Sequence, residues 1–187
     1  MASIVKASRW SDDIELFQHA LQVAPDSMRA QRQLALALTS AGRCYDAIPL
    51  FDRLLQRQEE PRSLLALGAC YYGQGRFAEA EPLIQRTITL APRYQEAYMM
   101  LTLTRLAQNQ PGEAETIWRR SVLVRLGPTD ARGLHLLGGQ ILKARGDLVA
   151  AAAEFKLELA GNPDFEEATR QLEEVEETLR KRSTASQ

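Results

Sequence analysis

One pattern recurs along this chain every 33 to 34 residues, and it constrains the fold more than any other feature. Relative to Leu67 and Ala80, the same pattern stands 33 positions earlier (67 − 34 and 80 − 47) and 34 positions later (101 − 67 and 114 − 80). A further copy follows at offsets of 70 and 71 (137 − 67 and 151 − 80). A period of this length indicates an array of small units that bury their apolar faces by stacking on one another.

The clearest copy covers residues 61–94 and predicts two short helices joined by a tight turn. Its first half places four side chains on one helix face: Leu64, Leu67, Gly68 and Tyr71. Its second half forms another apolar stripe: Phe77, Ala80, Ile84 and Ile88. Gly75 marks the turn between them because Gly tolerates a positive φ, and Pro92 follows where it cannot continue the helix. Gly68 and Ala80 are small enough for the two helix backbones to approach closely.

This unit resembles the tetratricopeptide repeat, a helix–turn–helix of about 34 residues. The residues that carry the resemblance are Leu67, Gly68, Tyr71, Ala80 and Pro92, while Leu64 stands where the family prefers Trp. The resemblance covers most of the chain. It implies an all-α fold, a right-handed α-solenoid of stacked helix–turn–helix repeats with a C-terminal capping helix.

The copies predict an order of segments along the chain. We expect a disordered lead-in (1–9), a half repeat with a second helix only (10–27), four repeats (28–60, 61–94, 95–129 and 130–163), a capping helix (164–182) and a disordered tail (183–187). Ser11 is the expected N-cap of the half repeat. Because the first helix of that half repeat is absent, Ile14, Phe17 and Leu21 are expected to present an apolar edge. A preceding domain, or a second chain in a homodimer, would cover it.

Composition narrows the classes of function. The formal net charge of −1 argues against a general electrostatic grip on nucleic acid. No apolar run approaches the roughly 18 residues of a membrane helix, so no membrane insertion is expected. Cys44 and Cys70 are too few for a disulfide scaffold and are expected to be small buried residues in a reducing compartment. We therefore expect a cytoplasmic protein.

The residues that usually carry chemistry are sparse. His19 and His135 are far apart and have no Cys or carboxylate at metal-ligand spacing, so we expect no metal site. Residues 137–140, Leu-Gly-Gly-Gln, lie inside a predicted helix rather than after a strand, so they are no phosphate-binding loop. We expect no catalytic residue and no cofactor.

The resemblance implies that the first helices line a concave surface that holds a peptide. Its expected apolar floor is Leu36, Leu65, Ala69, Tyr72, Met99, Leu103 and Leu106. Its expected rim contains Arg29, Arg32, Arg62, Arg132 and His135. In the subclass that binds acidic chaperone tails, Lys, Asn and Arg hold the carboxylates. Only Arg32 matches that set, so we predict instead an apolar or amphipathic segment with acidic flanks. Gly139 is expected to deepen this groove.

Several interpretations stay open at this point. The floor residues are also consistent with ordinary core packing between tightly wound repeats. As a function, we expect a protein-interaction adaptor. One alternative is a secretion-type chaperone for an apolar client. Another is a regulatory or oligomerisation segment of a larger enzyme, because repeat folds serve unrelated partners.

Overall fold

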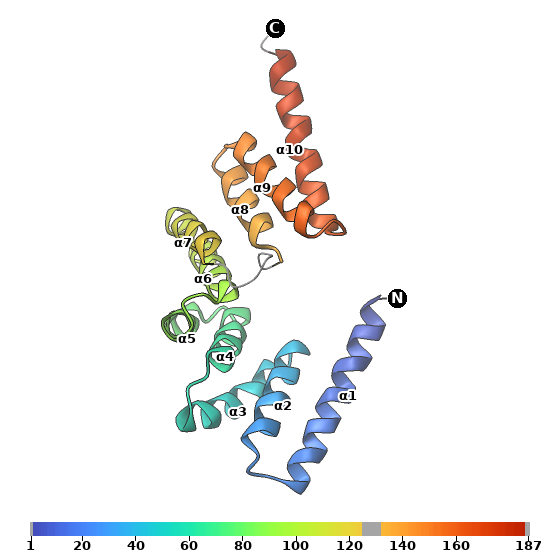
Figure 1. Ribbon diagram of the computed structural model, residues 1–187, viewed down its shortest axis with the longest axis vertical. Helices are drawn as coiled ribbons and strands as arrows, with labels where there is room; N and C mark the ends of the chain where they lie inside the picture. Colours follow the sequence, from blue (N-terminus) through green and yellow to red (C-terminus); the bar gives the residue numbers. More distant parts are fainter. Residues whose placement is uncertain (1, 125–131, 186–187) are drawn as a thin grey trace. The chain divides into compact units, whose positions relative to one another are not determined.

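The computed structural model describes residues 2–124 and 132–185, with side chains from Asp12 to Val124 and from Arg132 to Thr184. These residues form ten helices and no strand (Figure 1): α1 Ala2–Val23, α2 Met28–Ser40, α3 Cys44–Arg57, α4 Pro61–Gly73, α5 Phe77–Leu90, α6 Gln95–Ala107, α7 Pro111–Leu123, α8 Leu134–Ala144, α9 Leu148–Gly161 and α10 Glu166–Ala185. The helices pack as the pairs α2–α3, α4–α5, α6–α7 and α8–α9, with α1 on α2 and α10 on α9. The predicted all-α fold of stacked helix pairs is confirmed.

The chain divides into two compact units, Met1–Ala91 and Pro92–Gln187. The first unit holds α1 to α5, and the second holds α6 to α10. The predicted boundary between the third and fourth repeats, at residue 129, lies outside the described residues, as do residues 186 and 187 of the predicted tail.

The turn inside each helix pair is closed by a residue with positive φ. Gly75 has a φ of +73°, and its neighbour Arg76 donates its backbone N–H to the Tyr71 carbonyl at 2.9 Å, so the open end of α4 is capped as predicted. In the α6–α7 turn the same place is taken by Asn109, with a φ of 60°. Asn is the non-glycine residue that adopts this conformation most readily, so the turn survives without glycine.

The core of the first unit is built from the predicted stripes. Phe51, Ala80 and Ile84 are fully buried. A Cβ atom at Gly68 would lie 3.0 Å from Ile84 Cγ1 and 3.4 Å from the Ala80 carbonyl oxygen. The predicted close approach of α4 and α5 therefore depends on the missing side chain at Gly68.

Helix α1 differs from its prediction in two ways. It begins at Ala2 rather than near Trp10, because no Pro or Gly interrupts residues 2–23, and Ser11 therefore lies inside the helix. Ile14 is 6% exposed, and Phe17 and Leu21 pack against the same core as α2. The apolar edge expected at these three residues is therefore covered by the chain itself, and the dimer contact predicted there was wrong.

The second unit is organised around two aromatic side chains. Trp118 of α7 is 2% exposed and donates its indole N–H to the Leu134 carbonyl at 3.0 Å. A Cβ atom at Gly138 would overlap that indole ring, and one at Gly139 would overlap the Phe155 ring. Gly139 thus makes room for a core ring. The prediction that it deepens a groove was wrong.

Helix α10 covers the last pair as a capping helix. Ala168 and Val175 are buried, and Leu172 and Leu179 pack against the core beneath them. The helix continues to Ala185, beyond the predicted end at 182 and into the stretch that was expected to be disordered. Its last turns contain no Pro or Gly that would end it.

Candidate peptide-binding surface

In the first unit, the predicted floor residues occupy neighbouring faces of α2 and α4, which contact each other. Leu36 is half-buried and packs against the core, and Ala69 and Tyr72 are also half-buried. Leu65 is only 9% exposed, so it belongs to the core more than to an open surface. The remaining floor on this unit is a shallow apolar strip of Leu36, Ala69 and Tyr72.

Three arginines flank this strip, and they differ in what they contact. Arg29 and Arg62 are exposed, and within the described residues neither guanidinium makes a hydrogen bond or an ion pair. Arg32 is partly buried, and its Nε lies 3.9 Å from Glu60 Oε2. Two free cationic groups are therefore available beside the strip, and the third faces a carboxylate of the chain.

Sequence reasoning treated Glu59 and Glu60 as solvated charges, and the structure gives both a role. Glu60 is the N-cap of α4 and accepts hydrogen bonds from the backbone N–H groups of Arg62 at 3.2 Å and Ser63 at 2.8 Å. Glu59 accepts a hydrogen bond from Arg86 Nε at 2.9 Å, and this bond holds the pKa of the Glu59 carboxyl below its ordinary value of 4.5.

In the second unit, the predicted site residues are more closely engaged with the chain. Met99, Leu103 and Leu106 are half-buried and pack against the core of that unit. His135 Nδ1 lies 2.7 Å from Glu154 Oε2, and the Arg132 guanidinium carbon lies 4.6 Å from the centre of the Phe165 ring. Among the predicted site residues that the structure describes, only the strip on α2 and α4 thus combines open apolar surface with free charge.

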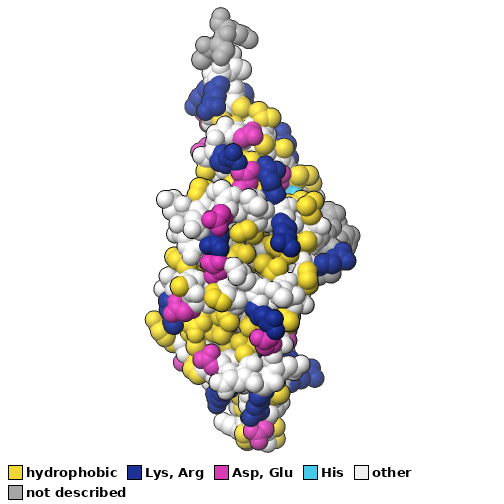
Figure 2. All heavy atoms as spheres, turned by 90° about the vertical axis from the view of Figure 1, so that its left-hand side faces the viewer, with side chains coloured by type: hydrophobic (Ala, Val, Ile, Leu, Met, Phe, Trp, Pro, Cys, Tyr) yellow, Lys and Arg dark blue, Asp and Glu magenta, His cyan; other side chains and the backbone are white. Residues whose placement is uncertain are grey.

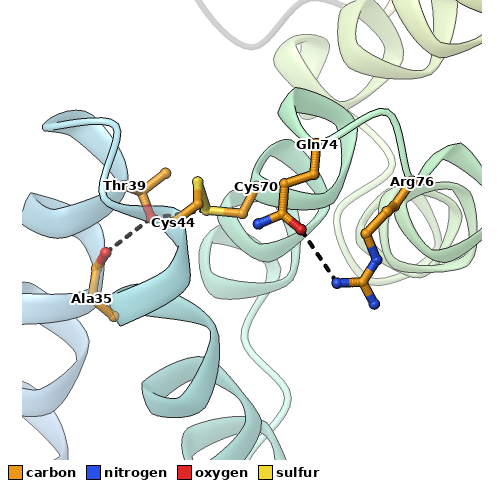
Figure 3. Close-up of a disulfide and its surroundings, with 6 residues drawn as sticks. All are labelled: Ala35, Thr39, Cys44, Cys70, Gln74 and Arg76. Atoms are coloured by element: carbon orange, nitrogen blue, oxygen red, sulfur yellow. Dashed lines mark hydrogen bonds between the residues drawn. A yellow bond between two sulfur atoms is a disulfide. The ribbon is translucent and has the colours of Figure 1, made fainter.

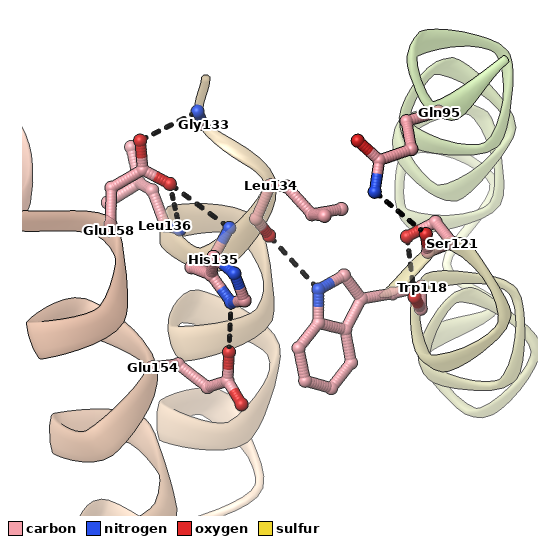
Figure 4. Close-up of polar contacts among 9 residues, drawn as sticks. All are labelled: Gln95, Trp118, Ser121, Gly133, Leu134, His135, Leu136, Glu154 and Glu158. Carbon is pink, nitrogen blue, oxygen red and sulfur yellow. Dashed lines mark hydrogen bonds and ion pairs between the residues drawn. The ribbon is translucent and has the colours of Figure 1, made fainter. Parts of the chain in front are cut away.

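A buried carboxylate, Glu158, closes the start of α8 (Figure 4). It is 1% exposed and accepts hydrogen bonds from the backbone N–H groups of Gly133 at 2.8 Å, His135 at 3.1 Å and Leu136 at 3.2 Å. The N-terminal N–H groups of a helix lack partners inside it, so this carboxylate satisfies them from α9. Sequence reasoning missed Glu158. The repeat register contained the signal, since it aligns with the buried Ser121 (158 − 121 = 37, as 151 − 114 = 37).

The two cysteines form a disulfide between consecutive repeats (Figure 3). Cys44 is the first residue of α3, Cys70 lies inside α4, and their Cα atoms are 5.3 Å apart. The Thr39 hydroxyl donates to the Ala35 carbonyl at 2.9 Å and lies 3.6 Å from Cys70 Sγ. The prediction of two unpaired cysteines was wrong. Stacking brings the start of one second helix beside the next first helix, a proximity that the sequence separation of 26 does not reveal.

The described residues hold little that suggests catalysis or a metal. No group of three or more His, Cys, Asp or Glu side chains among them is arranged to hold a metal ion. A depression of about 480 Å³ beside α7 is lined by Pro111, Gly112, Glu115, Thr116, Arg119 and Arg145. Its carboxylate, Glu115, is paired with Arg119 at 2.8 Å and with Arg145, so the depression is an ion-pair cluster at the surface.

The surface and the helices also bear on membranes and nucleic acid. None of the helices in the described part of the chain has the length and apolar character needed to span a bilayer. On the face that Figure 2 shows, basic and acidic side chains are interspersed. This mixture is consistent with the net charge of −1 and with the expectation that the chain does not bind nucleic acid through a basic face.

Comparisons with known proteins agree with this geometry. Residues 26–93 match the family model described as tetratricopeptide repeat. No curated protein sequence matches the chain.

Three solved structures resemble the chain. A thermophilic tetratricopeptide repeat protein of Thermus thermophilus is 17% identical, with a TM-score of 0.74 over 93% of this chain and 94% of that one. PilF of Pseudomonas aeruginosa is 19% identical, with a TM-score of 0.77 over 99% and 83%. PilW, described as a widely conserved type IV pilus biogenesis factor, is 26% identical, with a TM-score of 0.71 over 90% and 80%. With the stacked helix pairs and their positive-φ turns, these matches identify the chain as a tetratricopeptide repeat protein, a member of a family that generally acts through protein–protein contacts.

Proposed function

We propose that the chain is an adaptor that binds an apolar or amphipathic peptide segment with acidic flanks. The observation that carries this proposal is the strip on α2 and α4, where half-buried Leu36, Ala69 and Tyr72 lie between two free arginines, Arg29 and Arg62. An apolar strip of this kind accepts the apolar side of a peptide, and the guanidinium groups bind carboxylates beside it. On the second unit by itself, a further proposed contact surface consists of Met99, Leu103 and Leu106.

A labelled peptide pair tests the proposal. Both peptides carry the same amphipathic helical core, one with Asp and Glu flanks and the other with Lys flanks. Fluorescence anisotropy should show tighter binding of the acid-flanked peptide, and that preference should shrink as salt is raised. The double variant Arg29→Glu/Arg62→Glu should lower the affinity for the acid-flanked peptide about tenfold, since exposed charge pairs contribute up to about 1 kcal/mol each.

The matched control places the same charge change on another helix. Arg53→Glu/Arg57→Glu alters two exposed arginines of α3 and moves the net charge by the same amount. This variant should bind the acid-flanked peptide almost as well as the wild type. Equal loss in both variants would mean that net charge alone governs binding, and no loss in the α2–α4 variant would refute the role of Arg29 and Arg62.

A second candidate function comes from the likeness to PilW. At 26% identity over 90% of this chain, that likeness favours a role as an assembly factor, in which the same strip holds a component of a type IV pilus. This role is close to the secretion-type chaperone considered from the sequence. Deleting the gene in its source organism and imaging cells by electron microscopy tests it, because normal piliation would contradict it. The regulatory-segment alternative is tested by the length of the natural open reading frame.

The compartment is linked to the disulfide. The cytoplasmic prediction rested on two unpaired cysteines, and the pair Cys44–Cys70 supports an oxidising compartment instead. We expect alkylation of freshly lysed cells, followed by mass spectrometry, to find both cysteines unmodified until a reductant is added. Immediate alkylation of both thiols would support the cytoplasm.

A further inference from the structure

The outer face of α9 carries an exposed apolar stripe. Val149 is 70% exposed and Leu157 is 51% exposed, and Ala153, which is also exposed, stands midway between them. Residues four apart lie above one another on a helix, so these three form one continuous line. This stripe faces away from the core that Ala151 and Phe155 fill.

The other second helices show that such a stripe is not a requirement of the repeat. The register that aligns Ala151 with Ala114, Ala80 and Ala47 also aligns Leu157 with three exposed arginines: Arg53, Arg86 and Arg120. At the place of Ala153 the same helices carry Pro49, Pro82 and Thr116, all exposed. Only α9, among these four helices, replaces the cation by a large apolar side chain. A helix that is apolar on its outer face as well as its inner face is usually covered.

The charges on α9 are already engaged within the chain. Lys156 Nζ lies 2.8 Å from Glu176 Oε1, Glu154 pairs with His135, and Glu158 binds the backbone of α8. The stripe therefore offers an apolar surface without a free charge from its own helix. This favours an apolar partner surface over a charged one.

We propose that α9 binds α9 of a second copy of this chain, antiparallel and across a two-fold axis at Ala153. A two-fold contact requires a surface that is complementary to itself. The stripe meets this condition, because Val149 and Leu157 stand four residues on either side of Ala153, so Val149 of one copy meets Leu157 of the other. The small side chain at the centre allows the two helices to approach closely.

The charge pattern selects the antiparallel arrangement. Across such an axis, a residue at a given distance after Ala153 faces the residue at the same distance before it. Glu154 then faces Ala152, and Lys156 faces Ala150, so neither charge meets a like charge. A parallel pair would place Lys156 beside Lys156 and Glu154 beside Glu154, which is repulsive.

The size of the stripe sets the strength of the association. Val149 and Leu157 are separated by about 12 Å along the helix. A contact of this extent falls well below the roughly 1,000 Å² of a stable protein interface. The dimer is therefore weak and reversible, and it forms only at high protein concentration.

Light scattering over a concentration series tests the proposal on the full chain. The wild type should rise from 20.9 kDa toward twice that mass as the concentration increases. Leu157→Arg restores the cation of the other repeats and should stay at 20.9 kDa. The matched control, Leu123→Arg, removes an 83% exposed leucine from α7 and should associate like the wild type. A wild type of constant mass, or equal loss of association in both variants, would overturn the proposal.

A cross-linking experiment tests the arrangement itself. Both native cysteines are paired, so Ala153→Cys introduces one free thiol at the proposed axis. Under mild oxidation this variant should form a covalent dimer on a non-reducing gel, because the two Cβ atoms meet within the reach of a disulfide. Thr116→Cys places a thiol at the equivalent exposed position of α7 and should remain monomeric. Equal cross-linking of the two variants, or none in Ala153→Cys, refutes the antiparallel contact.

Discussion

Reducing the Cys44–Cys70 disulfide should weaken the first unit by a predictable amount. The bond closes a loop with a sequence separation of 26 residues. In the chain-entropy description, the entropy lost by the unfolded chain is 2.1 + 1.5R ln n cal/mol/K, which for this loop is about 12 cal/mol/K, or roughly 3.5 kcal/mol at 25 °C. This is a large share of the 5–15 kcal/mol that typically separates folded from unfolded domains.

Chemical denaturation provides the measurement. With an m-value of about 1.5 kcal/mol/M in urea, reduction should lower the midpoint of the first unit by roughly 2 M. Because the two units need not unfold together, hydrogen exchange should be followed helix by helix. Amides of α3 and α4 should lose protection on reduction, whereas α8 and α9 provide an internal control because both cysteines belong to the first unit.

A matched variant separates the bond from the reductant. In Cys44→Ala/Cys70→Ala the reductant should have no effect, and the stability should equal that of the reduced wild type within the small cost of losing two sulfur atoms. If the reduced wild type, with both thiols verified by titration, kept its urea midpoint to within a few tenths of a molar, the loop-closure reasoning would be wrong for this pair.

Three further perturbations address the second unit and the pH dependence. Gly138→Ala places a methyl group inside the α7 indole and should cost about 1–3 kcal/mol in urea unfolding, whereas Gly73→Ala, whose Cβ meets nothing within 4 Å, should stabilise by about 0.5–1 kcal/mol. Glu158→Ala leaves three backbone N–H groups without their acceptor and should cost about 2–3 kcal/mol, visible as a lower Tm, with Glu158→Gln losing less. The lowered pKa of Glu59 means that its contribution is fully present above pH 4.5 and is lost as the pH falls through the lowered value, so Arg86→Gln should flatten that part of a stability–pH curve.

Local signals predicted the fold because each helix pair carries its own punctuation. Gly75 and Pro92 mark a turn and an end whatever the surroundings are, and the spacing of Leu67 and Ala80 identifies the face that is buried. Even the α6–α7 turn, without glycine, follows the same chemistry through Asn109.

Predictions that depended on which surfaces meet fared less well. Ile14 was expected at an open edge, but α2 covers it, and Leu65 was assigned to a groove floor although it is 9% exposed. Both errors have one cause: helical periodicity gives the direction of a side chain, but it does not give the depth to which a neighbouring helix buries it. The proximity of Cys44 to Cys70 was hidden for the same reason.

The adjacent glycines of α8 have a consequence for how the array keeps its register. Gly138 faces the ring of Trp118 on α7, and Gly139 faces the ring of Phe155 on α9. Sliding α8 by one residue would replace one of these notches with a side chain, Leu137 or Gln140, and would drive it into an aromatic ring. Successive repeats are similar enough to pair in shifted alignments, and neighbouring units in an array risk misalignment during folding. The two notches act as a key that admits a single alignment of α8 between its neighbours.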